Sequence, residues 1–84
     1  MNSTKEYVDI DETIFKHALF LFSSYNAQDI DGAVETSFKK FATKEFVTNM
    51  AVLFDLNINA YKTELKRRIV NAFNSGRLKQ KQLS

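Results

Sequence analysis

Hydrophobic residues recur along this chain at intervals of three and four, the spacing of amphipathic α-helices. The first such segment covers about 12–25 and follows Asp11, a residue type that commonly caps a helix. At 100° per residue, its apolar side chains gather on one face: Ile14, Ala18, Leu21, Phe22 and Tyr25. Phe20 falls on the opposite, polar side, close to Lys16 and His17.

A second helix is expected within residues 27–41. Its apolar side chains follow a single stripe: Ile30, Val34, Phe38 and Phe41. The sequence leaves two alternatives for the residue at which this helix begins. Asn26 with Asp29 three residues later resembles a capping arrangement, Asp31 is an equally good cap, and Gly32 weakens the first turn.

The third predicted helix spans residues 44–54, with Thr43 as its N-cap. Its apolar face consists of Phe46, Val47, Met50, Leu53 and Phe54. Residues 55–59 are expected to form an extended connector in which Leu56 and Ile58 point into the core.

The fourth predicted helix spans residues 60–74 and ends at Asn74-Ser75-Gly76, where glycine suits the left-handed conformation that terminates many helices. Five of its side chains face inward: Tyr61, Leu65, Ile69, Ala72 and Phe73. Lys66 and Arg67 face outward, and Arg68 lies on the flank.

These elements predict an all-α fold, a small four-helix domain formed by residues 1–84. The absence of proline and the presence of only two glycines favour long helices joined by short turns. Within the single domain we expect a loose leader at 1–10, a helical hairpin at 11–42, a helix–loop–helix at 43–76 and a basic tail at 77–84, which contains Arg77, Lys79 and Lys81.

The net charge of +2 conceals an asymmetry along the chain. Residues 1–42 carry four basic and seven acidic side chains, whereas residues 43–84 carry eight basic and three acidic ones. The halves therefore have net charges of −3 and +5. A basic half is typical of proteins that bind anionic partners, and equally of a solvated face with a basic tail.

The composition limits the class of protein. There is no cysteine, so disulfides and thiolate metal sites are excluded and a cytoplasmic protein fits best. No apolar run reaches the ~18 residues of a membrane span. Eight Phe and three Tyr are enough to fill a small core and leave some aromatic surface for an interface.

Little in the sequence indicates catalysis or a cofactor. Asp29-Ile30-Asp31-Gly32 resembles part of a calcium loop but lacks its further oxygen ligands and terminal Glu. His17 is the single histidine and has no evident catalytic partner. No glycine-rich phosphate loop is present. We expect a non-enzymatic protein without metal or cofactor.

One motif suggests a binding module. Leu56 follows the third predicted helix, and the fourth contains K-x-E-L-x-x-R-I, in which the fixed positions are Lys62, Glu64, Leu65, Arg68 and Ile69. With this motif, residues 44–70 resemble a SAP domain, a helix–extended loop–helix module of chromatin and DNA-processing proteins. The Rho N-terminal and HeH/LEM folds share this geometry. The chain departs from the family pattern at Asp55 and Ala60, where the pattern has glycines.

The resemblance implies a DNA-binding accessory or regulatory protein with weak sequence specificity. Its candidate phosphate contacts are Lys44, Lys62, Lys66, Arg67 and Arg68. Phosphate contacts position a protein on DNA but read little base sequence. The small size and the composition are compatible with a phage or mobile-element protein.

The alternative is a protein–protein interaction module, an adaptor or inhibitor whose target is another protein, such as a nucleic-acid enzyme. Its candidate contact or dimer interface is Phe20 with His17, because a phenylalanine on the polar side of a helix needs something to cover it. Alternatively, the leader or the second helix would cover Phe20 within the monomer.

Overall fold

The computed structural model describes the backbone of residues 3–24 and 29–83 and the side chains of residues 4–24 and 29–76. This described part contains four α-helices and no strand, so the predicted all-α, four-helix fold is confirmed. The helices are α1 (Ser3–Ser24), α2 (Ile30–Phe41), α3 (Lys44–Phe54) and α4 (Ile58–Leu83).

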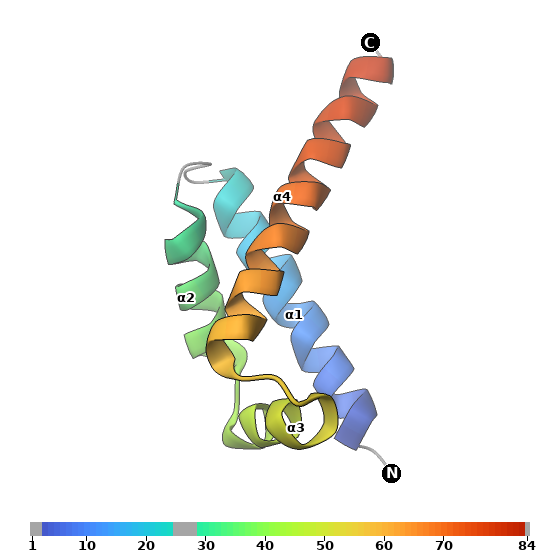
Figure 1. Ribbon diagram of the computed structural model, residues 1–84. Coiled ribbons are helices and arrows are strands. Elements are labelled where there is room, and N and C mark those ends of the chain that lie inside the picture. The colour runs from blue at the N-terminus through green and yellow to red at the C-terminus, as the bar shows by residue number, and fades with distance from the viewer. Residues whose placement is uncertain (1–2, 25–28, 84) are drawn as a thin grey trace.

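The helices are arranged around α1, which packs against each of the other three. In Figure 1, α2 lies alongside α1, and α4 crosses α1 and continues beyond the end of the bundle. The short helix α3 lies across the other end, near the N-terminus. This arrangement leaves α3 at one extremity of the molecule, with only one side of it packed against the bundle.

The core is built mostly from the faces that the periodicity predicts. Nine of the predicted inward side chains are buried: Ile14, Ala18, Phe22, Val34, Phe46, Met50, Tyr61, Leu65 and Ile69. The ring of Phe46 is the hub of an aromatic cluster. Its centroid lies 5.5 Å from that of Tyr61 and 6.2 Å from that of Phe38. These contacts connect α2, α3 and α4 with one another.

The prediction of a loose leader at residues 1–10 is wrong, because α1 begins at Ser3 rather than near residue 12. The cause is Tyr7, whose ring is buried and stacks on Phe46 with a centroid distance of 4.5 Å and an interplanar angle of 8°. Burial of a large aromatic ring stabilises the additional turns. Asp11 is therefore inside α1 and not its N-cap.

The start of α2 also differs from both predicted alternatives. Asp29 is the N-cap, and its Oδ1 accepts a hydrogen bond of 3.0 Å from the Gly32 amide. Asn26 lies outside the described residues, and Asp31 lies in the first turn. The absence of a side chain at Gly32 makes this cap possible, because a Cβ there would lie 2.8 Å from Cγ of Asp29.

The predicted N-cap of α3 is confirmed, since Thr43 Oγ1 accepts a hydrogen bond of 3.0 Å from the Phe46 amide. The helix ends at Asp55, which has a left-handed backbone with φ of 52°. Asp tolerates this conformation better than most residues, and glycine, which the SAP pattern has here, tolerates it best.

The connector after α3 is shorter than predicted. Asn57 caps α4 by accepting a hydrogen bond of 2.8 Å from the Ala60 amide, so the helix begins at Ile58. Leu56 is half-buried, whereas Ile58 is exposed rather than directed into the core. Leu53 and Phe54 of α3, which were predicted to face the core, are also partly exposed. The ring of Phe54 nevertheless packs on that of buried Tyr7, with centroids 4.6 Å apart.

The predicted end of α4 at Gly76 is wrong, because the helix continues to Leu83. Gly76 does not have positive φ and has open space around it, so nothing forces the helix to stop there. Ala72 and Phe73 are half-buried, in line with their predicted inward direction. The side chains of Tyr25, Arg77, Lys79 and Lys81 lie outside the described residues.

The role of Tyr7 can be measured by comparing two alanine variants of neighbouring residues. We expect Tyr7→Ala to lower the free energy of unfolding by about 3 kcal/mol, because it leaves a cavity beside Phe46. Val8 is 49% exposed, so Val8→Ala should cost about 0.5 kcal/mol. Urea unfolding monitored by circular dichroism tests both. Equal, small losses for the two variants would show that the N-terminal turns do not contribute to the core.

Candidate interaction surfaces

Two of the predicted phosphate contacts on α4 instead contact the acidic side of α2. Lys62 forms an ion pair with Glu35, and its Nζ lies 4.9 Å from the ring centroid of Phe38. Nζ of Lys66 lies 2.5 Å from Oδ1 of Asp31. Both lysines therefore hold α4 against α2.

The two arginines among the predicted phosphate contacts are paired as well. Arg67 binds Glu64 on its own helix, with Nη2 and Oε2 2.8 Å apart. Arg68 reaches across to α1, where its Nη1 lies 3.0 Å from Oδ1 of Asp11 and its guanidinium lies 4.8 Å from the ring centroid of Phe15. Of the five predicted phosphate contacts, Lys44 is the one whose side chain forms no ion pair with another described residue.

Asp11 is the centre of the contact between α1 and α4. The same Oδ1 that binds Arg68 also accepts a hydrogen bond of 2.6 Å from the Tyr61 hydroxyl. Burial of the ring, together with this hydrogen bond to a carboxylate, raises the pKa of Tyr61 well above its usual value of 10.0. The cluster joins residues 50 and 57 positions apart in the chain, and it is the most enclosed charged group among the ion pairs described.

These ion pairs affect how available the cations of α4 are to a phosphate. Exposed ion pairs contribute little to stability, so Lys66 and Arg67 can exchange partners readily. A phosphate approaching α4 would nevertheless meet Asp31, Glu35 and Glu64 beside each cation. Of the four basic side chains of α4 that the structure describes, three thus pair with carboxylates of α1 and α2, and Arg67 pairs with Glu64 of α4 itself.

The two residues of the predicted partner interface lie in different environments. His17 is half-buried between α1 and α2, where its Nδ1 and the hydroxyl of Ser37 share a hydrogen bond of 2.7 Å. Its ring also meets Phe41 edge-on, with centroids 5.1 Å apart. Phe20 is 56% exposed, on the same helix but turned away from the core. His17 therefore satisfies the buried Ser37 hydroxyl within the monomer, and Phe20 alone of the two presents a large apolar surface.

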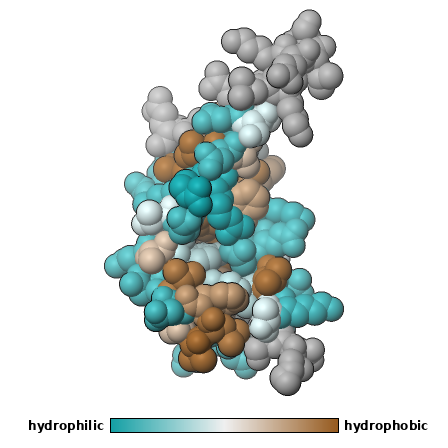
Figure 2. Space-filling view, turned by 45° about the vertical axis from the view of Figure 1, so that its right-hand side comes forward, coloured by the Kyte–Doolittle hydropathy of each residue, from teal (hydrophilic) through white to brown (hydrophobic). Residues whose placement is uncertain are grey.

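A larger apolar surface surrounds α3. Four of the seven large hydrophobic residues that are exposed in the described structure belong to it or to the first residue of α4: Val52, Leu53, Phe54 and Ile58. Val52 is the most exposed of all, at 73%. Figure 2 shows hydrophobic side chains gathered at the lower end of the molecule, where Figure 1 places α3. We call these four residues, together with Val47 and Ala51, the α3 surface.

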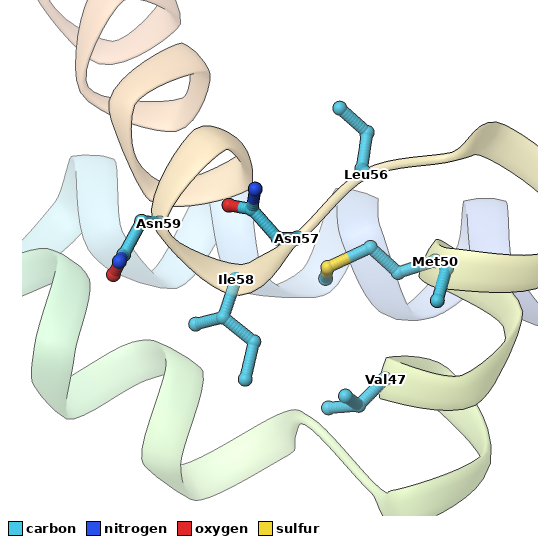
Figure 3. Close-up of a pocket in the computed structure, with 7 residues that line it drawn as sticks. Val47, Met50, Leu56, Asn57, Ile58 and Asn59 are labelled. Atoms are coloured by element: carbon cyan, nitrogen blue, oxygen red, sulfur yellow. The ribbon is translucent and has the colours of Figure 1, made fainter.

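An open pocket of about 520 Å³ lies within the α3 surface. It is lined by Val47, Met50, Ala51, Leu56, Asn57, Ile58 and Asn59. Figure 3 shows Val47 of α3 and Ile58 of α4 pointing toward one another across the opening, with Met50 beside them. Most of the lining residues are apolar, and Asn57 and Asn59 add two amide side chains. Such a pocket is suited to an apolar side chain of a bound polypeptide, whose backbone can form hydrogen bonds with the two amides.

The sequence contained a signal for this surface that periodicity alone does not use. The segment from Phe46 to Phe54 is apolar on nearly every side of the helix, and a helix at the edge of a small domain can bury only one side. Phe46 and Met50 take the buried side. The remaining apolar side chains of α3 are left partly or fully exposed.

Comparisons with known proteins bring no further identification: no family model, curated protein or solved structure matches this chain. The SAP resemblance therefore stays a prediction, although the helix–connector–helix order it implies is present in α3 and α4. Among the described residues, no three His, Cys, Asp or Glu side chains are grouped so that they could hold a metal ion. Within the same residues, no helix is both long and apolar enough to cross a membrane.

The hydrogen bond between Tyr61 and Asp11 predicts a particular response to alkaline pH. Unfolded Tyr61 loses its proton near pH 10, whereas folded Tyr61 retains it, so the folded state binds more protons above that pH. The contribution of Tyr61 to stability is therefore complete below pH 10 and declines as pH rises, by up to about 1.4 kcal/mol per pH unit.

The comparison variant is Tyr61→Phe, which keeps the ring and removes the hydroxyl. At pH 8 we expect it to be less stable than the native chain by about 1 kcal/mol, through loss of the hydrogen bond. At pH 11 the difference should be smaller or absent, as measured by urea unfolding at each pH. An equal difference at both pH values would contradict the assigned contact.

Proposed function

We propose that this chain is a small non-enzymatic interaction module that binds another polypeptide through the α3 surface. The observation that carries the proposal is an open apolar pocket between α3 and the start of α4, with exposed Ala51 and Ile58 among the residues that line it. Val52, Leu53 and Phe54 are exposed on other sides of the same short helix. A protein that acts alone in water rarely leaves its large apolar side chains grouped in this way. The arrangement resembles the grooves that accept an apolar anchor from a partner helix or peptide.

The alternative of DNA binding through α4 has weaker support. Four of its five candidate phosphate contacts are paired with carboxylates: Lys62, Lys66, Arg67 and Arg68. Asp55, next to the connector, adds a further negative charge where the SAP pattern has glycine. DNA would have to displace these carboxylates before the phosphates could be neutralised. An adaptor or inhibitor of a nucleic-acid enzyme, by contrast, needs only the protein contact.

The proposal can be tested with a phage-displayed library of 16-residue peptides, selected against the immobilised chain. We expect selected peptides to carry an apolar anchor and to bind with a Kd on the order of micromolar. Ile58→Lys should weaken that binding at least about tenfold, because it places a charge at the mouth of the pocket. Val70→Lys changes an exposed valine of α4 and serves as the matched control, with affinity unchanged.

A second measurement separates the two functions. The chain is titrated against a 20-base-pair duplex of random sequence at low salt. If the protein contact is its function, no complex forms. Binding that weakens with a log–log salt slope of about −4.5, as five neutralised phosphates require, would overturn the proposal in favour of DNA. Loss of that binding in Lys66→Glu with Arg67→Glu would assign it to α4.

A further inference from the structure

The outward side of α3 carries a pattern that is complementary to itself. Four exposed residues recur at intervals of four, three and four: Lys44, Thr48, Ala51 and Asp55. At 100° per residue the three helical positions fall within a narrow stripe along α3. Asp55, the C-cap, follows at the C-terminal end of that stripe. We call it the outer stripe. Val47 flanks it on one side and Val52 on the other.

The two ends of the outer stripe carry opposite charges, and its middle carries none. Lys44 is at the first position of α3 and Asp55 is its C-cap. Neither side chain forms an ion pair with any other described residue. Thr48 and Ala51 between them are small, which allows another helix to approach closely.

When a second α3 helix is placed antiparallel on the first, every residue of the outer stripe faces a complementary residue of the other copy. In this arrangement the residue numbers of each facing pair add up to 99. Lys44 meets Asp55 of the second copy at both ends, and Thr48 meets Ala51 twice in the middle. A two-fold axis requires this kind of self-complementary surface. A parallel arrangement would instead place Lys44 against Lys44 and Asp55 against Asp55.

We propose that the partner at the α3 surface is a second copy of this chain, bound through antiparallel packing of the two α3 helices. The proposal rests on the interaction function assigned to that surface and names its occupant. The contact buries the apolar flanks, including Val52, which is 73% exposed in the monomer. Each half of the dimer supplies one helix of 11 residues. We expect a Kd on the order of 10–100 µM, since so small a contact buries less than a standard interface of about 1,600 Å².

This dimer differs from the one expected at Phe20. Phe20 is near the C-terminal end of α1, and α3 lies near the N-terminal end of that helix in Figure 1. The two surfaces are thus at opposite ends of the bundle. Phe20→Ser is a control that should leave self-association through α3 unchanged.

The decisive experiment uses two charge-reversed chains, Lys44→Glu and Asp55→Lys, studied by sedimentation equilibrium up to about 1 mM. Each variant alone brings like charges together at both ends of the stripe, so we expect its dimer to be at least about tenfold weaker. An equimolar mixture restores both opposite-charge contacts. The mixed dimer should therefore form with near-native affinity. A parallel arrangement predicts a different pattern, in which each variant alone dimerises no more weakly than the native chain and the mixture dimerises more tightly than the native chain. No recovery in the mixture would overturn the proposed geometry.

A second pair of variants does not depend on Asp55, whose left-handed backbone disfavours lysine. Val52→Glu places a charge in the proposed contact, and we expect it to make the chain monomeric throughout this concentration range. Val70→Glu alters an exposed valine on α4 and should dimerise as the native chain does. Circular dichroism verifies that both variants remain helical.

The outcomes separate this inference from the function on which it rests. If the native chain is monomeric at 1 mM but its selected peptides still depend on Ile58, the second copy is excluded and the polypeptide-binding surface remains. If the chain dimerises and Val52→Glu leaves the dimer intact, the α3 stripe is not the interface and the inference is overturned. If Val52→Glu removes both the dimer and peptide binding, one surface serves both and the inference is supported.

Discussion

Arg68 of α4 and Asp11 of α1 form the ion pair that aligns the basic helix with the acidic half of the chain. Burial of Ile14, Leu65 and Ile69 drives the two helices together, but an apolar contact has little directional preference. The carboxylate of Asp11 adds direction, because it accepts from Arg68 and from the Tyr61 hydroxyl through the same oxygen. These three side chains therefore fix which face of α4 meets α1.

The same alignment determines which charges stay available. With α4 in this position, Lys62 and Lys66 lie beside the carboxylates of α2. Among the described residues, three ion pairs thus join the acidic and basic halves of the sequence inside the monomer: Lys62–Glu35, Lys66–Asp31 and Arg68–Asp11. A partner can still bind at the far end of the bundle, where α3 packs by Phe46 and Met50 and exposes its other apolar side chains.

Periodicity predicted most of the core, because each helix buries a stripe that recurs every three or four residues. On α3 it also assigned Leu53 and Phe54 to the core face, and both are exposed. It failed at Tyr7, since the first helix was predicted to begin after Asp11 and the partner of Tyr7, Phe46, is 39 positions away. It also failed at Asp11, because a short acidic side chain before an apolar run is equally suited to capping a helix and to binding a distant arginine.

The candidate site also combines features that local sequence predicts with features that depend on contacts between distant residues. The sequence placed four candidate basic residues on one helix, but it does not show that Asp31 and Glu35 lie beside two of them. For α3, the sequence showed the apolar residues and could not show how few of them the bundle would cover. Both outcomes depend on how the helices cross, which is set by contacts between residues far apart in the chain.

A double-mutant cycle on Asp11 and Arg68 tests the central claim most directly, because it isolates the coupling between the two side chains from their other contacts. The variants are Asp11→Ala, Arg68→Ala and the double variant, each measured by urea unfolding at low salt. The contact is half-buried, so we expect a coupling free energy of about 1–2 kcal/mol, above the usual range for exposed pairs. Losses that simply add, within about 0.3 kcal/mol, would show that this ion pair does not hold the acidic and basic halves together.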